Sequence, residues 1–115
     1  MLNDFYNQNK NKYNIFIIYI TEAHAADIWN IGESAGTINY SHKTISDRIS
    51  CAIKFRDTFK LDVPIYCDNM NDIAETYFSA WPFRYYVIDK NKNISMIGQP
   101  DESQFDLTIL FNFLE

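Results

Sequence analysis

Two histidines, His24 and His42, are the residues best suited to acid–base chemistry near neutral pH. Glu22 and His24 follow an apolar run at residues 15–20, and alternation along an extended backbone would place both on the same side. A carboxylate beside an imidazole can fix its tautomer and favour its protonated form, which suits proton delivery. The alternative is a loop histidine whose ring is hydrogen-bonded to the backbone.

His42 stands two residues before Thr44, which can cap a helix, with Asp47 three residues further on. This position alone indicates an exposed side chain near a helix start. We expect Asp47 to complete the cap and Arg48 to carry a solvent-facing charge.

Cys51 and Cys67 are the two cysteines, and neither belongs to a CxxC pair or has a histidine at metal spacing. This pattern argues against a disulfide scaffold and against structural zinc, and it indicates a reducing, cytoplasmic setting. Each cysteine is expected in the core, because Cys51 falls within a predicted helix and Cys67 ends a predicted strand. We find no phosphate-binding glycine loop, no nucleophile elbow and no zinc motif, and we expect no metal site.

Length and charge limit the remaining classes of function. A chain of 115 residues is expected to form a single domain over residues 1–115. Its net charge of −5, with no cluster of basic residues, argues against a nucleic-acid partner. The longest apolar run, at 15–20, is too short to cross a bilayer. Aromatic residues make up 17%, which indicates an aromatic-rich core or a pocket for an aromatic ligand.

Hydrophobic periodicity, caps and turn residues predict strands that alternate with helices, which favours an α/β fold. A long connection at 21–43 follows the first strand, and we expect it to carry the functional site because long loops in compact domains tend to be functional. The predicted helices are 3–12, 44–60, 70–80 and 101–114, and the predicted strands are 15–20, 63–67, 84–88 and 93–97.

The helices should bury one face each. The residues predicted to share the apolar face of helix 44–60 are Ile45, Ile49, Ala52, Ile53 and Phe59. Those predicted to point inward from helix 70–80 are Ile73, Ala74, Tyr77 and Phe78. The strand at 15–20 is expected to be a buried parallel strand, and 63–67 is expected to be a second buried strand.

The order helix, Trp81-Pro82, hairpin and helix is the order found in the C-terminal half of a thioredoxin-like domain. In that fold the proline beside the active site is cis, and Pro82 occupies its place. The expected fold class is therefore α/β and thioredoxin-like, β-α-β-α-β-β-α with the first βα unit truncated.

Four segments resemble motifs of the iodothyronine deiodinases, in order along nearly the whole chain. Residues 16–24, FIIYITEAH, with Asp27-Ile28-Trp29, are similar to "YIEEAHxxDGW", and residues 41–48, SHKTISDR, are similar to "QHRSLEDR". Residues 67–71, CDNMN, resemble "LDTMxN", and residues 77–88, YFSAWPFRYYVI, resemble "YGAxPERLYVI". The chain departs from these motifs at Thr21, Ile28 and Phe83, and in the shortened turn at 98–100.

The resemblance implies reductive removal of iodide from an iodinated aromatic small molecule, with a selenolate nucleophile and a thiol reductant as partner. It implies that His24 contacts the substrate phenol, that His42 and Tyr19 belong to a proton relay, and that Glu22 orients the site. Substrate contacts are also implied for Trp29, Pro82 and Arg84. A homodimer is a further expectation, as is a membrane anchor if a segment precedes Met1.

The nucleophile of the family would lie one strand–helix unit before the strand at 15–20, and neither Cys51 nor Cys67 aligns with it. No cofactor is expected in this chain, and the selenocysteine is expected upstream of Met1. One explanation is a UGA codon read as a stop. Two alternatives remain: a non-catalytic thioredoxin-like binding module, and a thiol oxidoreductase resembling peroxiredoxin or glutathione peroxidase.

Overall fold

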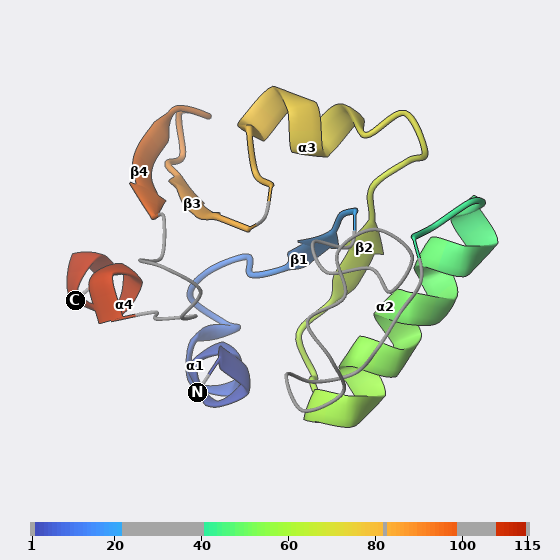
Figure 1. Ribbon diagram of the computed structural model, residues 1–115. Helices are drawn as coiled ribbons and strands as arrows, with labels where there is room; N and C mark the ends of the chain where they lie inside the picture. Colours follow the sequence, from blue (N-terminus) through green and yellow to red (C-terminus); the bar gives the residue numbers. More distant parts are fainter. Residues whose placement is uncertain (1, 22–40, 82, 99–107, 115) are drawn as a thin grey trace. The chain divides into compact units, whose positions relative to one another are not determined.

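A computed structural model describes residues 2–21, 41–81, 83–98 and 108–114 (Figure 1). The described part is a mixed α/β structure with four helices and two small sheets. The chain divides into two compact units, Met1–Ser79 and Ala80–Glu115, and each is described by itself. No described helix is long and apolar enough to cross a membrane.

The first unit contains three helices and two strands. Strand β1 (Ile17–Tyr19) pairs in parallel with strand β2 (Ile65–Cys67), and the two run in register, with Tyr19 opposite Cys67. Helix α2 (Ile45–Phe59) packs against β2, as Figure 1 shows. The prediction that 15–20 contributes a parallel strand is confirmed. The remaining elements are helix α1 (Leu2–Asn9) and helix α3 (Ile73–Phe78).

Helix α2 begins as its sequence predicts. The Thr44 side chain accepts a hydrogen bond from the Asp47 N–H, and the Asp47 carboxylate accepts one from the Thr44 N–H, which completes a capping box. Two N–H groups that have no partner within the helix are thereby satisfied. The helix ends at Lys60, whose left-handed backbone (φ 52°) reverses the chain before the loop to β2.

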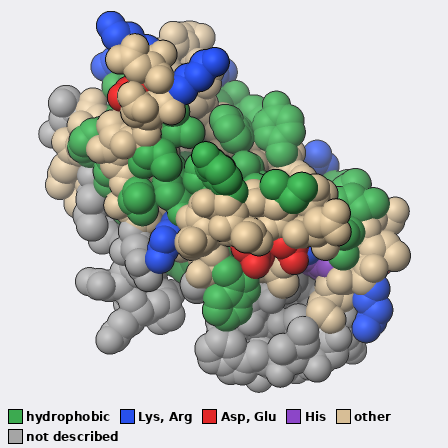
Figure 2. Space-filling view, turned by 90° about the horizontal axis from the view of Figure 1, so that it is seen from above, with side chains coloured by type: hydrophobic (Ala, Val, Ile, Leu, Met, Phe, Trp, Pro, Cys, Tyr) green, Lys and Arg blue, Asp and Glu red, His purple; other side chains and the backbone are tan. Residues whose placement is uncertain are grey.

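The core of the first unit is small and partly polar. Val63 and Ala52 are buried apolar residues, and Arg48 and Asp68 are buried charged ones. Many large apolar side chains are exposed, and Figure 2 shows hydrophobic surface in several separate areas. A small unit has too little interior to bury all of its apolar surface.

Several burial predictions are therefore wrong. The apolar residues expected on one face of α2 do share it, but of these only Ala52 is buried; the exposed ones are Ile45, Ile49, Ile53 and Phe59. In α3, Ile73 and Tyr77 are 60% and 79% exposed rather than inward. Ile18 in strand β1 and Phe16 just before it are also exposed, so the predicted strand 15–20 is not buried on both faces. Periodicity identifies the apolar face of an element but not how much of it another element covers.

The second unit is a hairpin followed by a helix. Strand β3 (Tyr85–Ile88) pairs antiparallel with strand β4 (Ile94–Gly98), and helix α4 (Thr108–Leu114) packs on β4. The Asp89 carboxylate accepts hydrogen bonds from the N–H groups of Asn91 and Asn93, which closes the predicted turn. Gly98 lies against the Tyr85 ring, so a larger side chain at that position would displace the ring.

Candidate functional site

A polar cluster lies where β1 and β2 end. Thr21 follows β1, and Asp68 follows β2 directly. Because the two strands are parallel, their carboxyl ends meet at one edge of the sheet, where α/β proteins commonly bind ligands.

Arg48 of α2 joins the two strand ends. Its side chain is almost fully buried, and its Nη1 donates to the carbonyl oxygens of Asp68 (3.2 Å) and Asn69 (2.7 Å). Its Nη2 donates to the Thr21 hydroxyl (3.3 Å) and forms an ion pair with Asp72 (3.0 Å). The expectation of a solvent-facing Arg48 is wrong. Arg48 lies one turn before buried Ala52, on the side of α2 that meets the sheet. There it donates to the backbone carbonyls that follow β2, which need a hydrogen-bond donor.

His42 is held by the same arginine. The Arg48 Nε–H donates to His42 Nδ1 at 2.9 Å, and the His42 ring is half-buried rather than exposed. The Tyr19 ring lies 6.0 Å from the His42 ring between centroids, tilted by 35°, and also contacts Phe55 at 5.7 Å. Tyr19 and His42, two of the predicted site residues, are therefore brought together from β1 and from the segment before α2.

Asp68 is buried and fully engaged. Its Oδ1 accepts from the N–H groups of Asn69 and Ala74 at 3.0 Å, and its Oδ2 accepts from the Glu75 N–H at 2.9 Å. The carboxylate thus satisfies N–H groups of the first turn of α3 and ties this helix to the end of β2.

Asp72 occupies the cap position of α3 in a left-handed conformation (φ 54°) but makes no side-chain cap bond. Its carboxylate instead accepts from the Thr21 hydroxyl (3.2 Å) and pairs with Arg48. Glu75 accepts weakly from the Thr21 N–H at 3.4 Å. Asp68 therefore caps the helix, which leaves Asp72 to neutralise the buried guanidinium.

Cys67 lies beside this cluster but is poorly suited to nucleophilic attack. Burial raises the pKa of the Cys67 thiol, and the positive charge of Arg48 offsets this only in part. The thiol is therefore largely protonated at neutral pH, whereas attack requires the thiolate. Both cysteines lie on the predicted elements, Cys51 in α2 and Cys67 at the end of β2, but each is half-buried rather than in the core.

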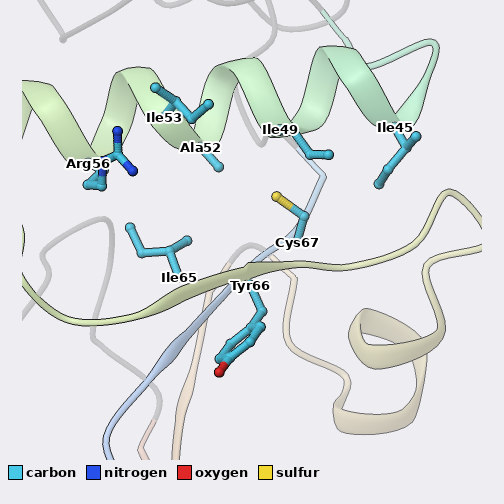
Figure 3. A pocket seen from close by; sticks show the side chains of 8 residues that line it. All are labelled: Ile45, Ile49, Ala52, Ile53, Arg56, Ile65, Tyr66 and Cys67. Carbon is cyan, nitrogen blue, oxygen red and sulfur yellow. The ribbon is translucent and has the colours of Figure 1, made fainter.

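An open apolar groove of about 370 Å³ runs between α2 and β2 (Figure 3). The Cys67 sulfur points toward α2, whereas the Tyr66 ring lies on the other side of β2. The groove differs from the polar cluster in that most of the side chains lining it are aliphatic. The lining residues are Ile45, Ile49, Ala52, Ile53, Arg56, Ile65, Tyr66 and Cys67.

The remaining predicted site residues are distributed differently. Glu22, His24, Trp29 and Pro82 lie outside the described residues, as does the cis bond expected at Pro82. Arg84 belongs to the second unit, where it is half-buried just before β3. Within the described ranges, no group of three or more His, Cys, Asp or Glu side chains could hold a metal ion.

Sequence reasoning missed Arg48, Asp68 and Asp72 as site residues. A usable signal was present, because Arg48 falls at the spacing of Ala52 on the buried face of α2. Asp68 directly follows a strand and precedes a helix, where a carboxylate often caps.

The geometry can be set beside known proteins. The family model described as iodothyronine deiodinase matches residues 3–115. A type I iodothyronine deiodinase of Xenopus laevis is 29% identical over 93 residues, which are 77% of this chain and 36% of that protein. A thyroxine 5-deiodinase of Gallus gallus is 30% identical over 86 residues, 75% of this chain and 33% of that protein. The chain spans about a third of the length of these curated relatives. Because the match covers nearly the whole chain, we conclude that it belongs to the iodothyronine deiodinase family.

Proposed function

We propose that this chain forms the proton-donating, substrate-binding part of a reductive deiodinase acting on an iodinated phenol such as thyroxine. Membership of the family supports the reaction class, and the names of the relatives support the substrate class. We also propose that the two units belong to a thioredoxin-like fold, which the β-α-β and β-β-α orders of the units support.

The single observation that carries the proposal is the contact between Tyr19 and His42 at the carboxyl end of β1. The resemblance to the family assigns both residues to a proton relay. A relay requires neighbouring groups that can each give and accept a proton, which a phenol and an imidazole do.

The reaction balances as follows. A chalcogenolate attacks iodine, the carbon–iodine bond breaks, and the ring carbon keeps the electron pair and takes a proton. An external thiol then attacks the chalcogen–iodine bond and releases iodide, and a second thiol regenerates the chalcogenolate and forms a disulfide. The ring carbon is thus reduced, and the sulfur atoms of the two thiols are oxidised to a disulfide. The relay of Tyr19 and His42 delivers the proton that the ring carbon takes.

The substrate-binding residues in this proposal are those that the family resemblance assigns. His24 would donate to the phenol oxygen, and Glu22 would orient it. Trp29, Pro82 and Arg84 would contact the aromatic rings and the remainder of the substrate.

The attacking atom is not provided by Cys67, whose protonated thiol is a weak nucleophile at neutral pH. The sequence of 115 residues contains no selenocysteine. We therefore propose that a selenolate outside this sequence attacks the iodine and that an external thiol is the reductant. The same observation on Cys67 favours a second candidate function, a binding module that retains iodinated aromatic ligands without turnover.

Binding and turnover are tested separately. We expect the chain to bind thyroxine more tightly than iodine-free thyronine in isothermal titration calorimetry, and His42→Ala and His24→Ala to weaken that binding. Lys43→Ala, next to His42 but exposed, is the matched control. With dithiothreitol as reductant, the chain should release no iodide.

Equal affinity for thyroxine and thyronine would overturn the substrate assignment. Iodide release by the chain would instead overturn the assignment of the nucleophile, and Cys51→Ser and Cys67→Ser would then identify the reactive thiol.

A further inference from the structure

We propose that Arg48 is a positioning residue that holds His42 as a neutral imidazole with its proton on Nε2. The basis is the hydrogen bond from Arg48 Nε to His42 Nδ1, at 2.9 Å. A guanidinium has five N–H donors and no acceptor, and it stays charged throughout the pH range of proteins. His42 Nδ1 must therefore be the acceptor, and the proton of the neutral ring resides on Nε2.

The orientation of the guanidinium is fixed because its other nitrogens already have partners. Nη1 donates to two backbone carbonyls, of Asp68 and Asn69, and Nη2 reaches the Thr21 hydroxyl and the Asp72 carboxylate. These partners come from the ends of both strands and from the start of α3, so rotation of the planar group would break several bonds together. With the side chain buried, water cannot replace them.

Among the charges around His42, the adjacent guanidinium of Arg48 disfavours an imidazolium, whereas the carboxylate of Asp47 attracts one. Arg48 lies directly against the ring, and an imidazolium there would face a cation and lose its bond at Nδ1. Asp72 pairs with Arg48, and the Asp47 carboxylate accepts from the N–H groups of Lys43 and Thr44. Tyr19, which faces the ring from β1, is neutral at pH 7.

The consequence rests on the proposed function. A ring held in this tautomer presents an N–H at Nε2, so His42 acts as a hydrogen-bond donor rather than as a base. In a reductive deiodination the ring carbon must gain a proton, and an N–H donor at Nε2 can stabilise the negative charge left on the relay group that gives it. The role of Arg48 is to set the orientation and tautomer, without touching the substrate.

The tautomer can be read directly by NMR, without substrate or turnover. The chain contains two histidines, so long-range ¹H–¹⁵N spectra of histidine-labelled protein show two imidazoles, and His42→Asn assigns them. At pH 7 we expect the His42 ring to be neutral and to carry its proton on Nε2. In Arg48→Met the excess of this tautomer over the Nδ1–H form should fall about tenfold, as loss of one charge-assisted hydrogen bond predicts. The His42 titration should also move to higher pH.

Arg56→Met is the matched control, because Arg56 lies two turns further along α2 and is exposed. It should leave the spectrum of His42 unchanged. A parent ring that is protonated at Nδ1 at pH 7 overturns the proposal even if Arg48→Met does not fold. A folded Arg48→Met with unchanged tautomer and titration overturns it as well. Failure of thyroxine binding would instead count against the proposed function and leave the tautomer result standing.

Discussion

At the scale of single residues, the candidate site depends on charges that are buried and paired. Arg48 and Asp68 are 2% and 5% exposed, and both bond to backbone groups where strands end and a helix begins. A buried charge is tolerated only when its hydrogen-bonding capacity is met locally. The same bonds that satisfy these charges fix the segments that carry Tyr19 and His42.

Asp68→Asn should destabilise the chain by about 1.5–3 kcal/mol, because an amide cannot accept all three N–H bonds that the carboxylate accepts. Urea unfolding followed by circular dichroism measures the change. Asp57→Asn is the control, since Asp57 is exposed and pairs with its exposed neighbour Arg56. Equal losses in the two variants would show that Asp68 has no special role.

Cys67 should be alkylated more slowly than a solvent-exposed cysteine, because burial raises the pKa of its thiol. In a Cys51→Ser variant, iodoacetamide at pH 7 should modify Cys67 several-fold more slowly in the folded chain than in urea. Mass spectrometry after timed quenching gives both rates. A folded chain that reacts faster than the unfolded one would mean an activated thiol, and would favour the thiol oxidoreductase alternative.

At the scale of elements, helix α2 is the element that positions the site, because it carries Arg48 and begins just after His42. Its capping box sets where it starts and therefore which side of the helix meets β2. Hydrogen bonds from the N–H groups of Lys43 and Thr44 hold the pKa of Asp47 below its ordinary value. The first turn of α2 is therefore stabilised by the ionised form of Asp47.

Thr44→Ala should cost about 1 kcal/mol of stability, the usual loss on removing a threonine cap. Thermal unfolding at pH 7 compares it with Thr58→Ala, an exposed change near the other end of α2. Because the folded pKa of Asp47 lies below its unfolded value, its contribution is present above about pH 4 and is lost as pH falls through the folded pKa. The destabilisation on acidification should therefore be smaller in Asp47→Asn; an identical acid dependence would contradict this.

The attachment of helix α1 to the first unit should weaken at acid pH. The side chains of Asn7 and Asn3 donate to the Asp62 carboxylate at 3.0 and 3.1 Å, and these bonds lower its pKa. The stabilisation is complete above the unfolded pKa of about 3.9 and is lost as pH falls through the folded one.

Hydrogen exchange at pH 5 provides the measurement for α1. Asp62→Asn should lower the protection of α1 amides while that of α2 amides stays unchanged. Equal protection of α1 in the parent and in the variant would show that Asp62 does not anchor it.

The elements were largely predictable, whereas the polar network was not. Thr44, Asp47 and an apolar periodicity predict α2 to within a residue at each end, and Asp89 to Asn93 predict the hairpin turn, because both signals are local. The burial of Arg48 was not predictable, since it depends on carbonyls of residues 68 and 69 that reach it only after β1 and β2 pair. For the same reason the exposure of Ile73 and Tyr77 could not be read from spacing alone.

At the scale of the whole molecule, membership of the deiodinase family rests on a match over nearly the entire chain, while the matched residues cover about a third of each relative. We propose that the proton-donating end of the site lies at the edge of the β1–β2 sheet. The apolar groove between α2 and β2 is one competing location for an aromatic ligand.

Chemical-shift mapping of ¹⁵N-labelled chain titrated with thyroxine tests this assignment most directly. We predict that the largest shifts fall on Tyr19 to Thr21, on His42 and on Asp68, with thyronine producing smaller ones. Shifts confined to Ile49, Ile53 and Ile65 in the groove, with the amides around Tyr19 and His42 unmoved, would contradict it.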